Sequence, residues 1–185
     1  MRRPRSGGTP RAWDRDVTVD EFEPTRDGGP PIDMLEQYFD ARGWSSELVG
    51  DDEILVTVQG SWAQYELRGV WRDEDRVLQF LAMPDIRVAP DKRAAIHETL
   101  ALINEQLWIG HFEMWSSSGL LLFRHALLLD GTGEAALTVE QVEALVDAAV
   151  EECERFYPVF QFVLWGGKSP ADAIAAALIE THGEA

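Results

Sequence analysis

The chain has 185 residues, of which 45% are hydrophobic, and it carries a formal net charge of −17 at pH 7. This composition is typical of a globular protein with one real core, and it excludes a chain that is disordered throughout. The charge argues against nucleic acids and anionic membrane surfaces as partners, because both would repel an acidic body.

The first 30 residues differ from the rest of the chain. They contain six arginines and six acidic residues, and almost no periodic apolar pattern. We therefore expect residues 1–30 to be a disordered tail and residues 31–185 to form one α+β domain. The Arg-rich start is not followed by an apolar stretch, and no run of about 18 apolar residues occurs. The sequence thus predicts neither an export signal nor a membrane span, and the cytoplasm is the expected location.

A helix is predicted from about residue 31 to 42, where Ile32, Leu35 and Phe39 recur at helical spacing. A short strand is possible in residues 45–50. Clear strand patterns follow at the ranges 53–59, 62–71 and 77–83, with polar turns between them. Because each connection is short, an antiparallel meander is the natural topology.

A second helix is predicted from Pro90 to about Leu107, and the strands "HFEMW" and "LLLFRHALLL" then flank the turn "SSSG". If Trp115 opposes Leu120, then Glu113 opposes Leu122 and His111 opposes Arg124. The other face, expected to meet the core, carries Phe112, Met114, Leu121 and Phe123.

This hairpin is therefore apolar on both faces, because Trp115, Leu120 and Leu122 lie on the second one. Helices can cover one face of the sheet. We expect a second subunit to cover the other, although additional helix would also serve.

Thr138, with Gln141 three residues later, forms a capping box that predicts the start of a third helix. Pro158 is expected to bend or end that helix. A last helix is predicted from Pro170 to about Thr181. The order of elements indicates an α+β fold, in which helices pack on a twisted antiparallel sheet of about five to six strands.

Residues 167–169 have the letters Gly-Lys-Ser, with which a phosphate-binding P-loop ends. The full pattern requires glycine at position 162, which is Phe162, and a strand in front of it, where a helix is predicted. A junction between two helices accounts for the same letters. Two glycines end one helix, and the next helix begins with Ser169, Pro170 and Asp172. A nucleotide site is therefore not expected.

Other chemistry is equally sparse in the sequence. His111 and His125 would point to opposite faces of the hairpin, and His97 lacks the spacing of a metal-binding helix. No serine has the surroundings of a hydrolase nucleophile. Cys153 is the only cysteine, which excludes an internal disulfide, and it is expected to be buried. We predict no catalytic, cofactor-binding or metal-binding residue, and hence no enzyme.

Tryptophan is frequent at interface hot spots, so its positions suggest a contact surface. Core packing of these side chains is an equally good explanation. The candidate interface residues are Trp62, Trp71, Trp115, Leu120 and Leu122.

The stretch from residue 100 to 129 contains Asn104 inside the end of an apolar helix, Gly110 before a strand, and "LLFR" after a short turn. This pattern resembles the YbjN family of bacterial sensory-transduction regulators. The terminal "WGGKSPADAIAAALIETHGEA" is similar to the alphaproteobacterial branch of that family. The resemblance covers roughly residues 31–183.

The resemblance implies a fold like that of the class I type III secretion chaperones, which are small, acidic and commonly dimeric. It implies no catalytic residues. Asn104 and Gly110 are the positions that match the family pattern, and both would be structural: a hydrogen bond at a helix end and a tight entry to a strand.

We therefore expect a non-enzymatic protein-binding module in a regulatory or chaperone-like role, acting as a homodimer. A basic or hydrophobic polypeptide would suit its acidic body. The alternative hypothesis is a small-molecule-sensing domain, in which the aromatic-rich sheet lines a ligand pocket.

Overall fold

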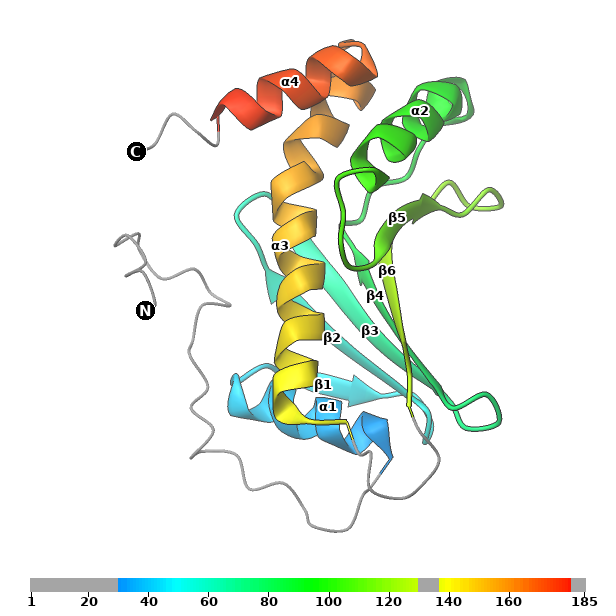
Figure 1. Ribbon diagram of the computed structural model, residues 1–185, viewed down its shortest axis with the longest axis vertical. Helices are drawn as coiled ribbons and strands as arrows, with labels where there is room; N and C mark the ends of the chain where they lie inside the picture. The colour runs from blue at the N-terminus through cyan, green and yellow to red at the C-terminus, as the bar shows by residue number, and fades with distance from the viewer. Residues whose placement is uncertain (1–29, 130–136, 181–185) are drawn as a thin grey trace.

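The computed structural model describes residues 30–129 and 137–180. The residues outside these ranges include most of the predicted N-terminal tail, most of the predicted loop that starts at Asp130, and the histidine at position 182. The elements are α1 (Pro31–Ala41), β1 (Ser46–Leu48), β2 (Glu53–Gln59), β3 (Gln64–Arg72), β4 (Val77–Met83), the 3₁₀ turn η2 (Pro90–Lys92), α2 (Arg93–Asn104), β5 (His111–Met114), β6 (Leu121–Leu128), α3 (Val139–Leu164) and α4 (Pro170–Glu180) (Figure 1).

The described strands form one six-stranded antiparallel sheet in the order β1-β2-β3-β4-β6-β5. The predicted α+β class and sheet size are confirmed. The first four strands form the expected meander, whereas β6 and not β5 lies beside β4. The longer strand of the hairpin takes this inner position, where it pairs with β4 from Val77↔Leu128 to Ala82↔Phe123.

The helices lie on one face of the sheet, with α3 running across it (Figure 1). That face carries the alternate apolar residues of the strands, such as Val56, Leu67 and Phe80, which are buried against α1 and α3. At the β5 end, the Phe112 ring makes edge-on contacts with two phenylalanines of α3. Its centroid lies 5.9 Å from that of Phe156 and 5.4 Å from that of Phe160. Burial of this face provides most of the hydrophobic stabilisation.

The start of α3 confirms the predicted capping box. Thr138 Oγ1 accepts the Gln141 N–H at 3.2 Å, and Gln141 Oε1 accepts the Thr138 N–H at 2.9 Å. These reciprocal bonds pair two donors that the first helical turn would otherwise leave free.

Of the two outcomes predicted for Pro158, a bend or an end of the third helix, the end is wrong, because α3 continues through Pro158 to Leu164. A proline inside a helix costs about 3 kcal/mol, since it removes one backbone hydrogen bond. Beyond it, Val159, Phe160 and Val163 are buried in the core. Burial of these three side chains offsets that cost.

The segment after α3 is a helix junction, as predicted for its Gly-Lys-Ser letters. Gly167 has a φ of 66°, in the left-handed region that favours glycine at a helix end. Ser169 Oγ accepts the Asp172 N–H at 3.2 Å and donates to Asp172 Oδ2 at 2.6 Å. A helix precedes the junction, where a P-loop would require a strand.

Two buried polar groups tie the helices to the rest of the fold. The Glu154 carboxylate of α3 accepts hydrogen bonds from Tyr65 Oη at 2.5 Å and from the Ser61 N–H at 2.9 Å, which anchors the β2–β3 turn. Burial, together with the Glu154 carboxylate, raises the pKa of Tyr65 far above its ordinary value. Arg42, just after α1, is buried and pairs with Asp147 of α3 at 3.3 Å.

None of the helices in the described part of the chain combines the length and apolar character that a membrane span requires.

The aromatic contacts of α3 generate a first prediction. Replacing Phe160 by Ala should lower the free energy of unfolding by about 3–5 kcal/mol, because it leaves a cavity beside Phe112. Phe162→Ala is the matched control, since Phe162 is only half-buried and contacts the Lys168 ammonium. Urea unfolding of both variants measures the difference. Equal losses would contradict the assignment of Phe160 to the core.

Candidate functional site

Within the described residues, no helix lies on the second face of the sheet, which we call the open face. It includes Arg68, Leu81, Leu122 and Glu113. Its centre is a small apolar cluster of Leu81, Met83 and Leu122, against which Val70 and Leu120 pack.

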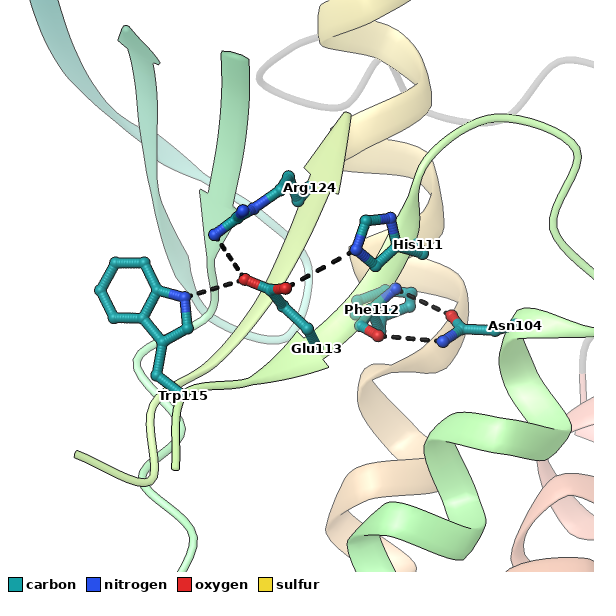
Figure 2. Close-up of polar contacts among 6 residues, drawn as sticks. All are labelled: Asn104, His111, Phe112, Glu113, Trp115 and Arg124. Atoms are coloured by element: carbon teal, nitrogen blue, oxygen red, sulfur yellow. Dashed lines mark hydrogen bonds and ion pairs between the residues drawn. The ribbon is translucent and has the colours of Figure 1, made fainter. Parts of the chain in front are cut away.

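A polar cluster on the β5–β6 hairpin borders these apolar residues, and its centre is Glu113 (Figure 2). Glu113 Oε1 accepts the Trp115 Nε1–H at 2.8 Å and lies 2.6 Å from Arg124 Nη2. Its other oxygen lies 3.6 Å from His111 Nε2. The hairpin register that the sequence predicted, His111 opposite Arg124 and Glu113 opposite Leu122, is confirmed.

Leu122 is buried although no helix of the described residues lies above it. It is 0% exposed, and it stands directly opposite Glu113 in the ladder. It packs in one apolar cluster with Leu81 and Met83 of β4. Trp115 and Arg124 hold the neighbouring Glu113 carboxylate in place.

A second ion-pair group borders the apolar cluster on the side of β2 and β3. Arg68 Nη1 lies 3.2 Å from Glu53, and Arg68 Nη2 lies 3.4 Å from Glu66. Arg68 stands opposite Leu81 in the ladder, and Leu81 stands opposite Arg124. The apolar cluster therefore lies between two arginines that carboxylates hold in place.

A shallow groove of about 280 Å³ continues the open face toward the segment after β4. Its lining combines the apolar side chains of Met83 and Leu120 with polar and charged residues. Asp85 in this wall has a φ of 52°, an uncommon backbone conformation for a residue other than glycine. The groove is lined by Thr57, Gln64, Glu66, Met83, Asp85, Arg87 and Leu120.

Asn104 ends α2, three residues before the predicted end at Leu107, and it binds the β5 backbone (Figure 2). Its amide nitrogen donates to the Phe112 carbonyl at 3.0 Å, and its amide oxygen accepts the Phe112 N–H at 2.8 Å. One side chain thus satisfies both outward-facing backbone groups of Phe112, which a further strand would otherwise pair.

Gly110 makes the tight entry to β5. It has a φ of 68°, and a Cβ at this position would collide with the Phe123 ring and lie 2.8 Å from the Arg124 carbonyl oxygen. Only glycine combines this backbone conformation with so close an approach.

The structure does not bring the five candidate interface residues together. Trp62 is exposed in the β2–β3 turn, while Trp115 and Leu120 border the open face. Trp71 is only 7% exposed on the helix-covered face, and Leu122 is buried in the cluster with Leu81 and Met83. Trp71 and Leu122 thus leave no surface for a partner.

Several polar groups of this region were not among the candidate residues. The Arg124–Glu113 pair was accessible to sequence reasoning, because the predicted register places both residues on one face of the hairpin. The contribution of Asp85 and Arg87 to the groove could not be predicted from the sequence, because it depends on the path that the chain takes after β4. The same holds for Glu154, which meets Tyr65 only through the packing of α3.

The described residues contain no group of three or more His, Cys, Asp or Glu side chains that could hold a metal ion. Cys153 is buried, and burial raises the pKa of its thiol far above the ordinary value, so a thiolate nucleophile is disfavoured. The open face thus combines a buried apolar cluster with charged side chains that are held in ion pairs.

The fold thus defines an α+β protein in which one antiparallel sheet is covered by helices on one face only. The sequence model of the YbjN family, described as "Putative bacterial sensory transduction regulator", matches residues 31–162. The chain belongs to the YbjN family.

A similar solved structure is the "Crystal structure of YbjN, a putative transcription regulator from E. coli". It is 19% identical, with a TM-score of 0.49, and the match covers 68% of this chain and 87% of that chain. The comparison with curated proteins found no match.

The Asn104 amide generates a second prediction. Asn104→Ala leaves the N–H and C=O of Phe112 without their partner, and it should lower the free energy of unfolding by about 2 kcal/mol. It should also speed hydrogen exchange at the Phe112 amide. Gln106→Ala is the control at the same helix end, where only one bond of 3.3 Å to the Leu102 carbonyl is lost. Unchanged exchange at Phe112 would contradict this role of Asn104.

His125, on the helix-covered side of β6, generates a third prediction. Burial, and secondarily the neighbouring His111, lower the pKa of His125 below its ordinary value. The unfolded chain therefore takes up this proton first as the pH falls below about 6.5, and the folded state loses stability there. Urea unfolding at about pH 7.5 and 5.5 should show a larger loss for the wild type than for His125→Gln. Parallel losses would contradict the burial of a neutral imidazole.

Proposed function

We propose that this chain is a non-enzymatic regulatory module that binds a polypeptide and acts as a homodimer in the cytoplasm. The observation that carries the proposal is the open face. It offers a groove, the half-buried side chains of Val70 and Leu120 and the exposed edge of Trp115, with charges held in ion pairs at its borders.

The shape and chemistry of the groove support a polypeptide as the partner. At about 280 Å³ it is slightly smaller than typical small-molecule pockets, and it is shallow and lined by polar and apolar surface in equal parts. A chain segment could place an apolar side chain over Met83 and Leu120 and its backbone against the polar walls. Rings such as that of Trp115 are frequent anchors of such contacts.

The charge of the protein narrows the chemistry of that partner. The segment from residue 31 to 185 carries 27 acidic and 10 basic residues and therefore the whole −17. Such a body attracts basic segments and repels acidic ones. A basic or hydrophobic polypeptide is thus favoured over nucleic acid.

Binding through the open face generates a fourth prediction. A polypeptide that copurifies with the wild type from bacterial lysate should be lost with Trp115→Ala, which removes an exposed ring at the border of the open face, and weakened with Glu66→Lys, which reverses a charge in the groove. Trp165→Ala and Glu151→Lys are matched controls, since both residues are exposed and belong to the helical side. Retention of the partner by all four variants would contradict binding at this face.

The groove also favours a second candidate function, the sensing of a small polar molecule. Glu66, Asp85 and Arg87 together could hold a ligand that carries both charges. A ligand that binds the folded state raises the melting temperature. A thermal-shift screen that finds such a ligand, with the effect abolished by Arg87→Ala, would support this function in place of the first.

A further inference from the structure

The helix α1 and the first half of α3 carry acidic side chains and no basic ones. The residues 31–41 and 139–154 contain nine acidic residues, and neither segment contains lysine, arginine or histidine. Five of the acidic side chains are exposed or half-buried and define what we call the acidic surface: Asp33, Asp40, Glu140, Glu143 and Asp147.

The acidic residues of α3 lie on its outer face. Glu140, Glu143 and Asp147 follow one another at spacings of three and four residues, so they share one side of the helix. The buried Val142 lies on the opposite side, in the core. Ala144, between the acidic residues, is exposed. The outer face of α3 is therefore without a partner in the described part of the chain (Figure 1).

Contacts between α1 and α3 join the two parts of this surface, at the end of the molecule where α3 begins (Figure 1). Arg42 Nη2, just after α1, lies 3.3 Å from Asp147 and 3.8 Å from Glu143. Burial raises the pKa of Asp147 above its ordinary value, and Glu143 and Glu151 raise it further, against the opposing effect of Arg42. The acidic surface thus has more carboxylates than the Arg42 guanidinium can pair.

The segment that precedes α1 divides by charge into two parts. Residues 1–13 contain four arginines and no acidic residue, whereas residues 14–29 contain six acidic residues and two arginines. The neutral sum of the first 30 residues therefore combines a basic end with an acidic spacer. The acidic surface attracts the basic end and repels the spacer. The four arginines of the basic end are Arg2, Arg3, Arg5 and Arg11.

The spacer is long enough to bring the basic end to the acidic surface. The chain enters α1 at Pro31, and the 11 residues of α1 are about 16 Å long. From Glu140 to Asp147, α3 adds about 10 Å. The chain from Arg11 to Pro30 can span up to about 60 Å, which exceeds the two lengths together.

We infer that the basic end of this chain, residues 2–11, docks on the acidic surface of the same molecule, where its arginines pair with carboxylates of α1 and α3. Arginine suits this contact, because its planar guanidinium can bind both oxygens of a carboxylate. The contact lies on the helical side and is independent of the open face and of the function proposed above. Any basic polypeptide that binds the acidic surface must first displace this segment.

The segment of the chain itself fits this surface better than other occupants. A second copy presents the same acidic residues and is repelled, as is nucleic acid. A separate basic polypeptide has the required charge, but the covalent tether holds the basic end at an effective concentration on the order of 1 mM. The open face attracts the basic end less, because its Glu53, Glu66 and Glu113 already pair with arginines.

Paramagnetic relaxation tests the docking in the full chain. A spin label on Ser6→Cys reports where the basic end lies, and Cys153 stays unlabelled because it is buried and its thiolate is disfavoured. The amide signals of residues 140–147 should be attenuated at about 50 mM salt and should recover at about 500 mM, where screening is stronger. The signal of Thr57, at the open face, should not change.

Charge reversal then locates the contact. Asp40→Lys combined with Glu140→Lys alters the acidic surface, and Glu98→Lys combined with Glu105→Lys is the matched control at α2, where both residues are also exposed. Because both double variants change the net charge equally, a difference between them measures location. The first should abolish the attenuation and the control should keep it. Replacement of the four arginines of the basic end by glutamine should abolish it as well. Far-UV circular dichroism verifies that each variant is folded.

A synthetic peptide of residues 1–13 provides an independent measurement, because it competes with the tethered segment. For a peptide dissociation constant of about 0.1 mM, the wild type should bind the peptide about tenfold more weakly than the variant without the four arginines. Equal affinity of the two chains would overturn the docking. So would an attenuation that persists in the Asp40→Lys, Glu140→Lys variant, or one that appears at Thr57 in place of residues 140–147.

Discussion

The one-sided covering of the sheet is the constraint on which the rest of this structure depends. Among the described residues, α1, α2 and α3 pack against the same face, α4 packs on α2 and α3, and α3 supplies the longest apolar stripe. The opposite face must therefore bury its own apolar residues. It does so within the sheet itself: Leu81, Met83 and Leu122 pack in one cluster, beside a Glu113 carboxylate that Trp115 and Arg124 hold in place.

The edges of the sheet follow a related rule. An exposed edge offers backbone groups to any strand, so each edge needs an explicit solution. Asn104 is the solution at β5, where one amide replaces the missing neighbour strand and also ends α2. Gly110 makes this possible, because the chain can turn into β5 beside the Arg124 carbonyl only without a Cβ. The two positions that match the YbjN pattern thus act together at one corner of the fold.

Charge and geometry both support the proposed regulatory role. The acidic body repels other acidic molecules, and the open face carries a groove and arginines held by carboxylates. Buried polar contacts tie α3 to the β2–β3 turn, through Glu154, and to α1, through Arg42.

Local patterns of the sequence predicted much of this protein. Some features depend only on neighbours within a few positions, so the local sequence determines them. These are the capping box at Thr138, the register of the β5–β6 hairpin and the helix junction at residues 166–172. Other features depend on packing between distant segments. These are the course of α3 through Pro158, the inner position of β6 and the burial of Leu122. The same is true of the Tyr65–Glu154 bond, which joins residues 89 positions apart. Local propensity and hydrogen bonding are encoded in adjacent residues, whereas the free energy of burial depends on which surfaces meet, and only the tertiary structure decided that.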